Sequence, residues 1–277
     1  MRRKKCVKRA AVCLSLFFLG GGCFLPFQAV FAEGNKGNEW ELLSSYTTYF
    51  NENDRGRCEN IRIAASLIDG VTVQAFGDFS FNQTVGKRTA ELGFQQAKII
   101  INGEYKLGVG GGVCQVSTTL YNAALKSGLE ITEFHPHSLC VSYVEPSRDA
   151  MVSSSSDLCF FNPFSHAVQL RVQRLNGGIK IAFYGKNTGD RYEITSKILE
   201  KIPPPPPVIK EGDKEEILRS PKSGIKSEAY LERYLGERLV ERKRIRKDAY
   251  LPIQGIIVKK NQEETKNLPS NACVFLQ

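Results

Sequence analysis

Two segments of the chain space their apolar residues as one face of an α-helix. The first extends from Asn60, a favourable N-terminal cap, to Asp69, and Gly70 follows it as a natural stop. The second extends from about Gln115 to Lys126, directly after a glycine-rich stretch. The pattern therefore predicts two short helices in the first half of the chain.

The other apolar segments are short and typical of strands. Asn102–Gly103 and Asn176–Gly178 carry turn residues, which predicts two tight hairpins. Because the helical patterns come first and most strands follow, we expect an α+β fold, with helices packed on an antiparallel sheet and then a small β module. The segments expected to be extended are Phe79–Asn82, Ile99–Tyr105, Leu139–Val144, Leu158–Phe161, Val168–Val172 and Ile179–Tyr184.

A run of five prolines, Pro203–Pro207, interrupts this pattern. Consecutive prolines form a stiff extended segment and cannot lie in an inner strand, so they predict a spacer with few contacts across it. In the charged module beyond, Ala229–Val240 and Ala249–Val258 are the expected main strands. The predicted division is a signal peptide (1–32), a first domain (40–200), a proline hinge (201–208), a small β module (209–260) and a loose tail (261–277).

The first 32 residues have the pattern of an export signal. Six Lys and Arg residues precede an apolar run, Ala10–Phe27, and Val30–Ala32 places small residues where a signal peptidase cuts, so cleavage before Glu33 is expected. An uncleaved anchor is the alternative, because a bilayer span needs about 20 apolar residues. Both predict a protein outside the cytoplasmic membrane, either secreted or associated with the cell envelope.

The export signal also changes the meaning of the net charge of +9. Its six bases face no acid, so the remaining chain has 32 Lys and Arg against 29 Asp and Glu, which does not indicate nucleic-acid binding. Five cysteines remain, an odd number, so at least one thiol is free or intermolecular. Their spacing indicates neither a disulfide scaffold nor a zinc ribbon.

The segment Gly108–Thr119, GVGGGVCQVSTT, is the strongest candidate for chemistry. It places Cys114 between a glycine-rich loop and a helix start, where unpaired amides and the helix dipole favour a thiolate. The glycines let a substrate carbonyl approach the backbone, and the amides of Val113, Cys114 or Gln115 are candidates to stabilise an oxyanion. The alternative is a buried structural cysteine in a tight turn.

A cysteine nucleophile needs a base, and His135-Pro136-His137 follows closely. Along the expected strand, His137 shares a face with apolar residues and should point into the domain, so it is preferred to His135 as the base. Asp149 or Glu145 could orient its imidazole, and Tyr143 could donate to a reacting oxygen. In the alternative interpretation, either histidine is a satisfied polar group at a strand edge.

A metal site is a further alternative, because H-x-H-x-x-C forms a plausible half-site. The residues of a ligand type are Cys114, His135, His137 and Cys140. No paired ligand motif accompanies them, so we expect that no metal ion and no other cofactor is required.

Four long segments resemble the VanW family, which is named for an accessory protein of vancomycin-resistance clusters. The resemblance covers roughly Tyr46 to Tyr184, and the charged module after the prolines is similar to small β modules of wall-associated proteins. Two positions depart from the family pattern: Cys140 stands where proline is usual, and Ser147 where glycine is common. The matching segments are Asn60–Gly70, Phe79–Ala97, Gly108–Ile131 and His135–Ala150.

This resemblance implies a function in the cell wall. Some members act as L,D-transpeptidases through the cysteine of the GGGVCQ motif, whose position Cys114 occupies. The expected partners are peptidoglycan stem peptides and the cell wall, and the oligomeric state stays open. A non-enzymatic wall-binding module and a stem-peptide hydrolase are the rival interpretations. The expected catalytic residues are Cys114, His137, Asp149 and Tyr143, and the expected oxyanion or substrate-binding residues are Gly111, Gly112, Val113, Gln115, Ser117, His135 and Arg148.

Overall fold

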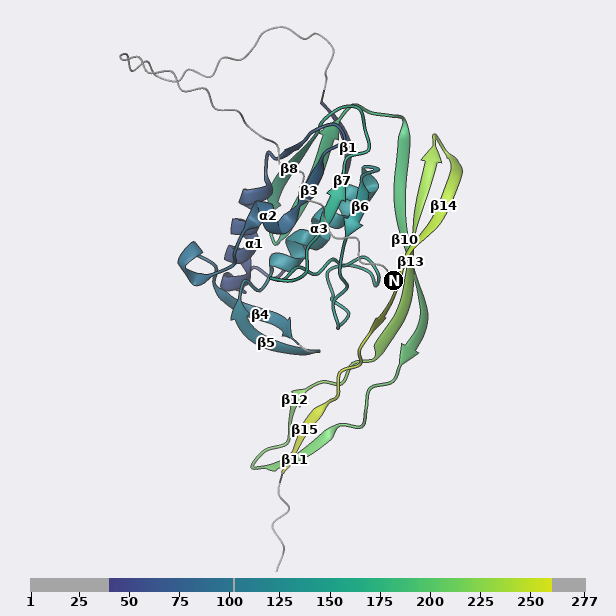
Figure 1. Cartoon of the computed structure of the whole chain (residues 1–277). Coiled ribbons are helices and arrows are strands. Elements are labelled where there is room, and N and C mark those ends of the chain that lie inside the picture. The colour runs from purple at the N-terminus through teal and green to yellow at the C-terminus, as the bar shows by residue number, and fades with distance from the viewer. Residues whose placement is uncertain (1–39, 102, 261–277) are drawn as a thin grey trace, which may run out of the picture. The chain divides into compact units, whose positions relative to one another are not determined.

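The computed structural model describes residues 40–101 and 103–260 of the chain (Figure 1). The predicted signal peptide (1–32) and the predicted loose tail (261–277) lie outside the described residues, as does Cys273. Among the residues that are described, no helix combines the length and the apolar character that crossing a membrane requires.

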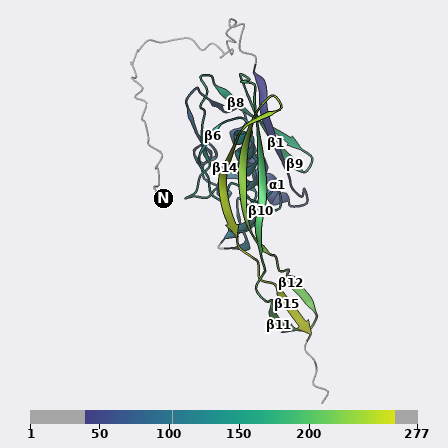
Figure 2. The same ribbon diagram turned by 90° about the vertical axis from the view of Figure 1, so that its right-hand side faces the viewer.

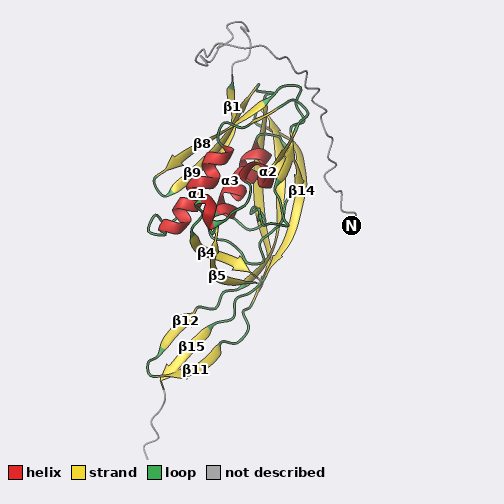
Figure 3. Ribbon diagram, turned by 60° about the vertical axis from the view of Figure 1, so that its left-hand side comes forward, coloured by secondary structure: helices red, strands yellow, loops and turns green. Residues whose placement is uncertain are grey.

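The described residues form mostly strands, arranged in several small sheets around three α-helices (Figures 1 and 3). The expected α+β arrangement, with helices packed on an antiparallel sheet, is therefore wrong. The elements in chain order are β1 (Glu41–Tyr49), α1 (Arg55–Ile68), β2 (Thr72–Val73), β3 (Asp78–Ser80), α2 (Phe81–Val85), η1 (Ala90–Leu92), β4 (Gln96–Ile101), β5 (Glu104–Val109), α3 (Val113–Lys126), β6 (Glu130–Glu133), β7 (Cys159–Phe161), β8 (Val168–Leu175), β9 (Gly178–Gly185), β10 (Asp190–Ile202), β11 (Val208–Gly212), β12 (Glu216–Arg219), β13 (Gly224–Leu235), β14 (Arg238–Tyr250) and β15 (Ile256–Lys260).

The physical reason for the different class lies in the strand partners. The strands after α3 do not pair in one sheet but reach strands from both ends of the chain. Strand β9 pairs with β8 and β1, β7 pairs with β3 and β6, and β10 pairs with β13. The pairings between distant segments, such as β9 with β1 and β10 with β13, leave no local signal in the sequence.

The predicted helices and hairpins, which rest on strong local patterns, agree better with the structure. Both predicted helices form, and each begins a few residues earlier than its apolar pattern suggests. Helix α1 begins after Asp54, whose carboxylate accepts a hydrogen bond of 3.2 Å from the amide of Arg57. The hairpins β4–β5 and β8–β9 form at the two predicted turns.

Helix α3 lies at the centre of the described fold and packs against α1, β1, β9 and β10 (Figure 3). Twelve of its residues are buried, so it has almost no solvent face. Its buried polar side chains find internal partners, as where the Thr119 and Thr48 hydroxyls lie 2.7 Å apart. These hydrogen bonds fix the rotation of the helix about its own axis. The orientation of the first turn of α3 is therefore fixed as well.

The proline run does not separate two groups of independent strands. Strand β10, before Pro203–Pro207, pairs antiparallel with β13 along nearly its whole length, from Asp190 with Leu235 to Ile202 with Gly224. Strands β10, β13 and β14 form a long ribbon (Figure 2). The expectation of few contacts across the prolines is therefore wrong, whereas the predicted domain division stays a prediction.

The expected strands of the module also end differently. The β13–β14 hairpin turns at Gly236, whose φ is +59°, so the predicted strand Ala229–Val240 spans the turn. The predicted strand Ala249–Val258 is divided between the end of β14 and β15.

The segment between β6 and β7 contains no strand or helix, so the predicted strand Leu139–Val144 is wrong. Its backbone polar groups bond with distant groups instead of a neighbouring strand. The amide of His137 donates to the Asp149 carboxylate at 2.7 Å, and the carbonyl of Ser138 accepts from the amide of Leu251 at 2.8 Å. This irregular segment forms one side of the candidate site.

Candidate active site

A cleft of about 1290 Å³ opens over the N-terminus of α3. The start of the helix, the glycine-rich loop before it, the β4–β5 hairpin and the irregular segment contribute its walls. The predicted site residues that line it are Gly111, Gly112, Val113, Cys114, Gln115, His137 and Tyr143.

Cys114 is the second residue of α3 and is half-buried in the floor of this cleft. The N-cap of the helix is Gly112, which provides no side-chain cap, so no capping side chain neutralises the helix dipole beside Cys114. Burial acts to raise the pKa of the Cys114 thiol, but a hydrogen bond to His137, the charge of His137 and the charge of Arg88 outweigh it and lower the pKa below its ordinary value. The Sγ atom also lies 3.4 Å from the carbonyl oxygen of Val152.

His137 lies between this thiol and a buried carboxylate. Its Nδ1 is 2.7 Å from Oδ2 of Asp149, and the same oxygen accepts from its backbone amide. Burial alone would lower the pKa of His137, but the hydrogen bonds and charges of Asp149 and Cys114 raise it to about 9. A thiol with a lowered pKa beside an imidazole with a raised pKa favours a thiolate–imidazolium pair at neutral pH.

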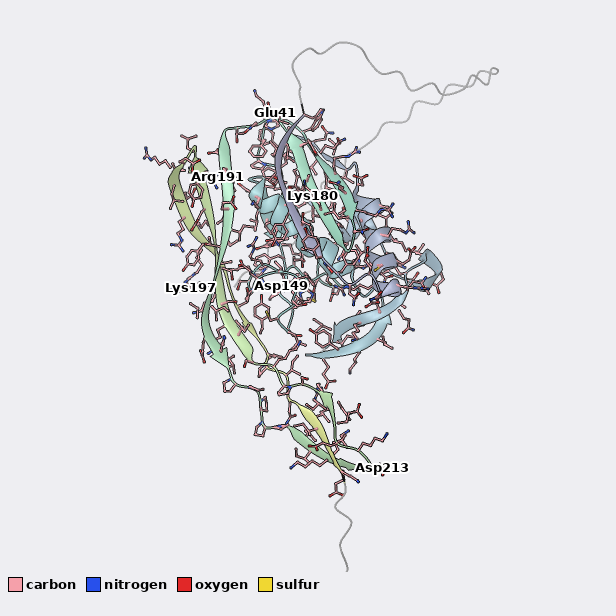
Figure 4. The ribbon with its side chains drawn as sticks, turned by 180° about the vertical axis from the view of Figure 1, so that it is seen from behind. Glu41, Asp149, Lys180, Arg191, Lys197 and Asp213 are labelled. Carbon is pink, nitrogen blue, oxygen red and sulfur yellow. The ribbon has the colours of Figure 1, made fainter. Side chains whose placement is uncertain are left out.

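The carboxylate of Asp149, a residue labelled in Figure 4, also has partners on its other side. Burial would raise its pKa, yet the hydrogen bond and charge of His137, and then the charge of Arg246, lower it. The Tyr250 hydroxyl donates to Oδ1 at 2.5 Å, and Nη2 of Arg246 lies 3.4 Å from the same atom. Asp149 therefore stays ionised and can fix the orientation of the imidazole.

Of the three amides proposed for an oxyanion, two are already engaged. The amide of Val113 donates to the carbonyl of Gly110 at 3.1 Å, and that of Gln115 to the carbonyl of Gly112 at 2.9 Å. The Cys114 amide makes no such bond within the described part of the chain, so of the three it is the one left available to an acceptor oxygen.

Two glycines of the loop are needed for packing. A Cβ on Gly111 would lie 2.7 Å from the carbonyl oxygen of Lys98. Gly112 has φ of +108°, and a Cβ there would lie 3.0 Å from the carbonyl oxygen of Arg57. Because these residues have no Cβ, the start of α3 packs closely against β4 and α1. This packing fixes the position of Cys114.

The cleft wall beside Cys114 contains Tyr143, whose phenol hydrogen-bonds with Thr118. Burial raises the pKa of Tyr143, and the charge of Cys114 raises it further, so the phenol stays protonated. Gln115 accepts a bond from Arg57 at 2.7 Å and donates to Thr48 at 3.0 Å, which locks its side chain as part of the wall.

Four predicted site residues do not line the cleft: Asp149, which contacts His137 from behind, and Ser117, His135 and Arg148. Ser117 is buried and its Oγ lies 2.7 Å from the carbonyl oxygen of Ala150. His135 pairs with Glu133 at 2.9 Å. Arg148 donates to Asn122 and Glu145, so the structure assigns it partners away from the thiol.

The alternative metal site would need Cys114, His135, His137 and Cys140 to converge. His135 instead pairs with Glu133, and the Cys140 thiol contacts the carbonyl of Val141. Within residues 40–101 and 103–260, no three or more His, Cys, Asp and Glu side chains cluster in a way that could hold a metal ion. Among the described cysteines, Cys58, Cys114 and Cys140 form no disulfide.

Sequence reasoning missed three residues of this site. Arg246 and Tyr250 lie on β14, far from Cys114 in the chain, and Arg88 lies in the loop after α2. Alternation along a strand puts positions 246 and 250 on one face, which could have indicated an inward-facing polar pair. No sequence signal could have paired that face with Asp149.

Residues 56–184 match the family model described as VanW like protein. This part of the chain, residues 56–184, is therefore a VanW-like domain. The chain is also 40% identical over 167 residues to a Bacillus subtilis (strain 168) protein described as "Uncharacterized protein YoaR". That segment covers 60% of this chain and 53% of YoaR, so the chain spans about half the length of this curated relative.

One solved structure, described as "Crystal structure of HP0197-G5", aligns with 25% of this chain and 97% of its own length, at 16% identity and a TM-score of 0.14. The VanW-like region of this chain contains Cys114, His137 and Asp149. Arg246 and Tyr250 lie outside that region, on a ribbon that the family model does not cover.

Proposed function

We propose that this protein with a VanW-like domain is a cysteine acyltransferase of the cell envelope, an L,D-transpeptidase that acts on peptidoglycan stem peptides. The observation that carries the proposal is the contact of the Cys114 thiol with the His137–Asp149 pair on the floor of an open cleft. A thiolate at a helix N-terminus, with an oriented imidazole beside it, is suited to acyl transfer.

The reaction would proceed in two steps. The Cys114 thiolate attacks the carbonyl carbon of the donor's penultimate residue, the carbon–nitrogen bond breaks, and the His137 imidazolium gives its proton to the departing terminal D-amino acid. A thioester remains on Cys114. An amine of a second stem peptide then attacks the thioester and loses a proton to His137, and the thiolate leaves. The amide of Cys114 would stabilise the oxyanion in both steps.

The test is incubation of purified protein with a stem tetrapeptide, followed by mass spectrometry. The proposal expects an adduct on Cys114 equal to the donor without its terminal residue, and a cross-linked dimer when an acceptor amine is present. Shortened peptide without a dimer would favour a hydrolase. Peptide binding without an adduct or product would favour the non-enzymatic binding module.

Export is part of the proposal, because stem peptides lie outside the cytoplasmic membrane. The basic and apolar N-terminal segment supports it. We expect N-terminal sequencing of the secreted or envelope fraction to find chains that begin at Glu33. Chains that still begin at Met1 in the membrane fraction would establish the anchor instead.

The charge of the cleft suits a donor that bears carboxylates. Four Lys and Arg residues line it, against a single Asp, Asp54, which caps α1. Arg88 is the base whose charge acts on Cys114, and only its Nη1 makes hydrogen bonds within the described residues, to Asn82 and Gly86. The remaining guanidinium nitrogens are available to a ligand carboxylate.

We expect Arg88→Gln to weaken binding of anionic donors. Loss of a charge-assisted hydrogen bond should raise KM about tenfold or more. A measurement that needs no substrate is the ratio of Cys114 alkylation rates with iodoacetate and iodoacetamide, which should fall in the variant because only iodoacetate carries a charge. Arg171→Gln, outside the cleft, is the matched control. Equal slowing with both reagents would contradict a role in anion binding.

A further inference from the structure

The two carboxylate oxygens of Asp149 have partners in two different parts of the chain. Oδ2 accepts from the Nδ1 and the backbone amide of His137, both at 2.7 Å. Oδ1 accepts from Tyr250 at 2.5 Å and lies 3.4 Å from Arg246. The same arginine donates from Nη1 to the backbone carbonyl of Asp149, so it contacts both the main chain and the side chain of Asp149.

The two β14 residues are themselves fixed. The side chains of Asp149 and Arg246 are each only 1% exposed, and Tyr250 is equally buried. Arg246 also donates from Nε to Asp248 at 2.7 Å and lies with its guanidinium 4.7 Å from the centre of the Phe134 ring. Rotation of Asp149 would therefore break several bonds within a buried network.

The irregular segment is tied to the same tyrosine. The amide of Ser147 donates to the Tyr250 oxygen at 2.7 Å, so this hydroxyl accepts from one residue and donates to Asp149. The φ of Ser147 is +62°, a conformation in which glycine is favoured. Burial and the charge of Asp149 raise the pKa of Tyr250, so the phenol keeps the proton that it donates.

We propose that Tyr250 and Arg246 are positioning residues of the thiol site, so that strand β14, outside the family-matched region, is an integral part of the active centre. They act through Asp149: by holding Oδ1 they direct Oδ2 to His137, and the oriented imidazole keeps Cys114 as a thiolate. The acyl-transfer consequence rests on the function proposed above, whereas the effect on the thiol does not.

The test is Tyr250→Phe, which keeps the ring in the core and removes the hydroxyl. We expect the rate of Cys114 alkylation by iodoacetamide at pH 7 to fall about tenfold, the lower end of effects seen when a group that orients a functional histidine is lost. The midpoint of the alkylation pH profile should rise, because a displaced Asp149 no longer sustains the imidazolium that lowers the thiol pKa. If acyl transfer is confirmed, kcat should fall while KM is unchanged.

Tyr234→Phe is the matched control, because Tyr234 donates to the carboxylate of Glu232 at 2.9 Å on the same ribbon, away from Asp149. A double-mutant cycle adds a readout that a purely structural role would not change: in an Asp149→Asn background, Tyr250→Phe should slow alkylation no further. Arg246→Lys is a second variant, expected to shift the profile in the same direction.

Folded Tyr250→Phe and Arg246→Lys proteins with wild-type alkylation profiles would overturn the inference, as would fully additive effects in the cycle. If both variants fail to fold while Tyr234→Phe folds, the two residues have a structural role and the inference is equally wrong. A shifted thiol profile in a protein that forms no cross-links would instead uphold the positioning role and reject the proposed function.

Discussion

Replacement of Cys114 by serine is expected to abolish acyl transfer, with a loss of about 10⁴-fold or more, the range seen when a catalytic nucleophile is removed. The hydroxyl of serine has almost the size of the thiol but a far higher pKa, so the imidazole of His137 cannot keep it ionised. The fold should survive, because the thiol is half-buried and its hydrogen bonds within the described residues are those to Val152 and His137. The measurement is cross-linked product formed per minute, with the melting temperature as a check on folding.

The matched control is Cys58→Ser, at a half-buried thiol on α1. Burial, followed by the charges of Asp54 and Glu52, raises the pKa of Cys58, so it should be a poor nucleophile at neutral pH. Alkylation at pH 7 should label Cys114 before Cys58. Full cross-linking by a folded Cys114→Ser protein would reject the catalytic assignment and leave the binding-module interpretation.

His137→Ala is expected to have the second largest effect. The rate of acylation should fall about 10²- to 10⁴-fold, the usual contribution of a general acid or base. The pH dependence has a defined sign. His137 supplies the two largest effects that lower the pKa of Cys114, so their loss leaves burial dominant and the thiol pKa rises. The alkylation midpoint should therefore move to higher pH, measured with iodoacetamide between pH 5 and 10.

In the wild-type protein the ion pair should persist over the window between the lowered pKa of Cys114 and the raised pKa of His137, about 9. Activity should be lost below this window as the thiolate is protonated, and above it as the imidazolium loses the proton that the leaving amine needs. His135→Ala is the control, because its imidazole pairs with Glu133 outside the cleft and its loss should be mild. Equal effects of the two substitutions would reject His137 as the base.

The comparison of expected and observed strands explains why the fold class was wrong. Apolar alternation correctly located β7, β8 and β9, because each strand buries one face or both in the core. Alternation does not specify which strand lies beside which. The partner of β9, strand β1, comes from the start of the described chain, and the partner of β10 comes after the prolines.

The expected strand around Leu139 shows a second limit of pattern reasoning. Leu139 and Val141 are buried, as the alternation predicts, and so is His137. The pattern therefore identified the inward-facing residues of a segment that is not a strand. Burial at every second residue occurs here in irregular backbone, where the buried carboxylate of Asp149 binds the amide of His137.

The sequence by itself determined the local features of this protein: the helix that begins beside Cys114, the glycines that precede it, the hairpin turns and the resemblance to the VanW family. These features depend on residues near one another in the chain, so helix propensity, φ preference and spacing are enough to predict them. Only the tertiary structure decided that His137 meets Cys114 and Asp149 meets His137, that His135 and Arg148 do not line the cleft, and that Tyr250 and Arg246 hold Asp149. These contacts join segments up to about a hundred residues apart, and the pairing of β10 with β13 and of β13 with β14 brings them together.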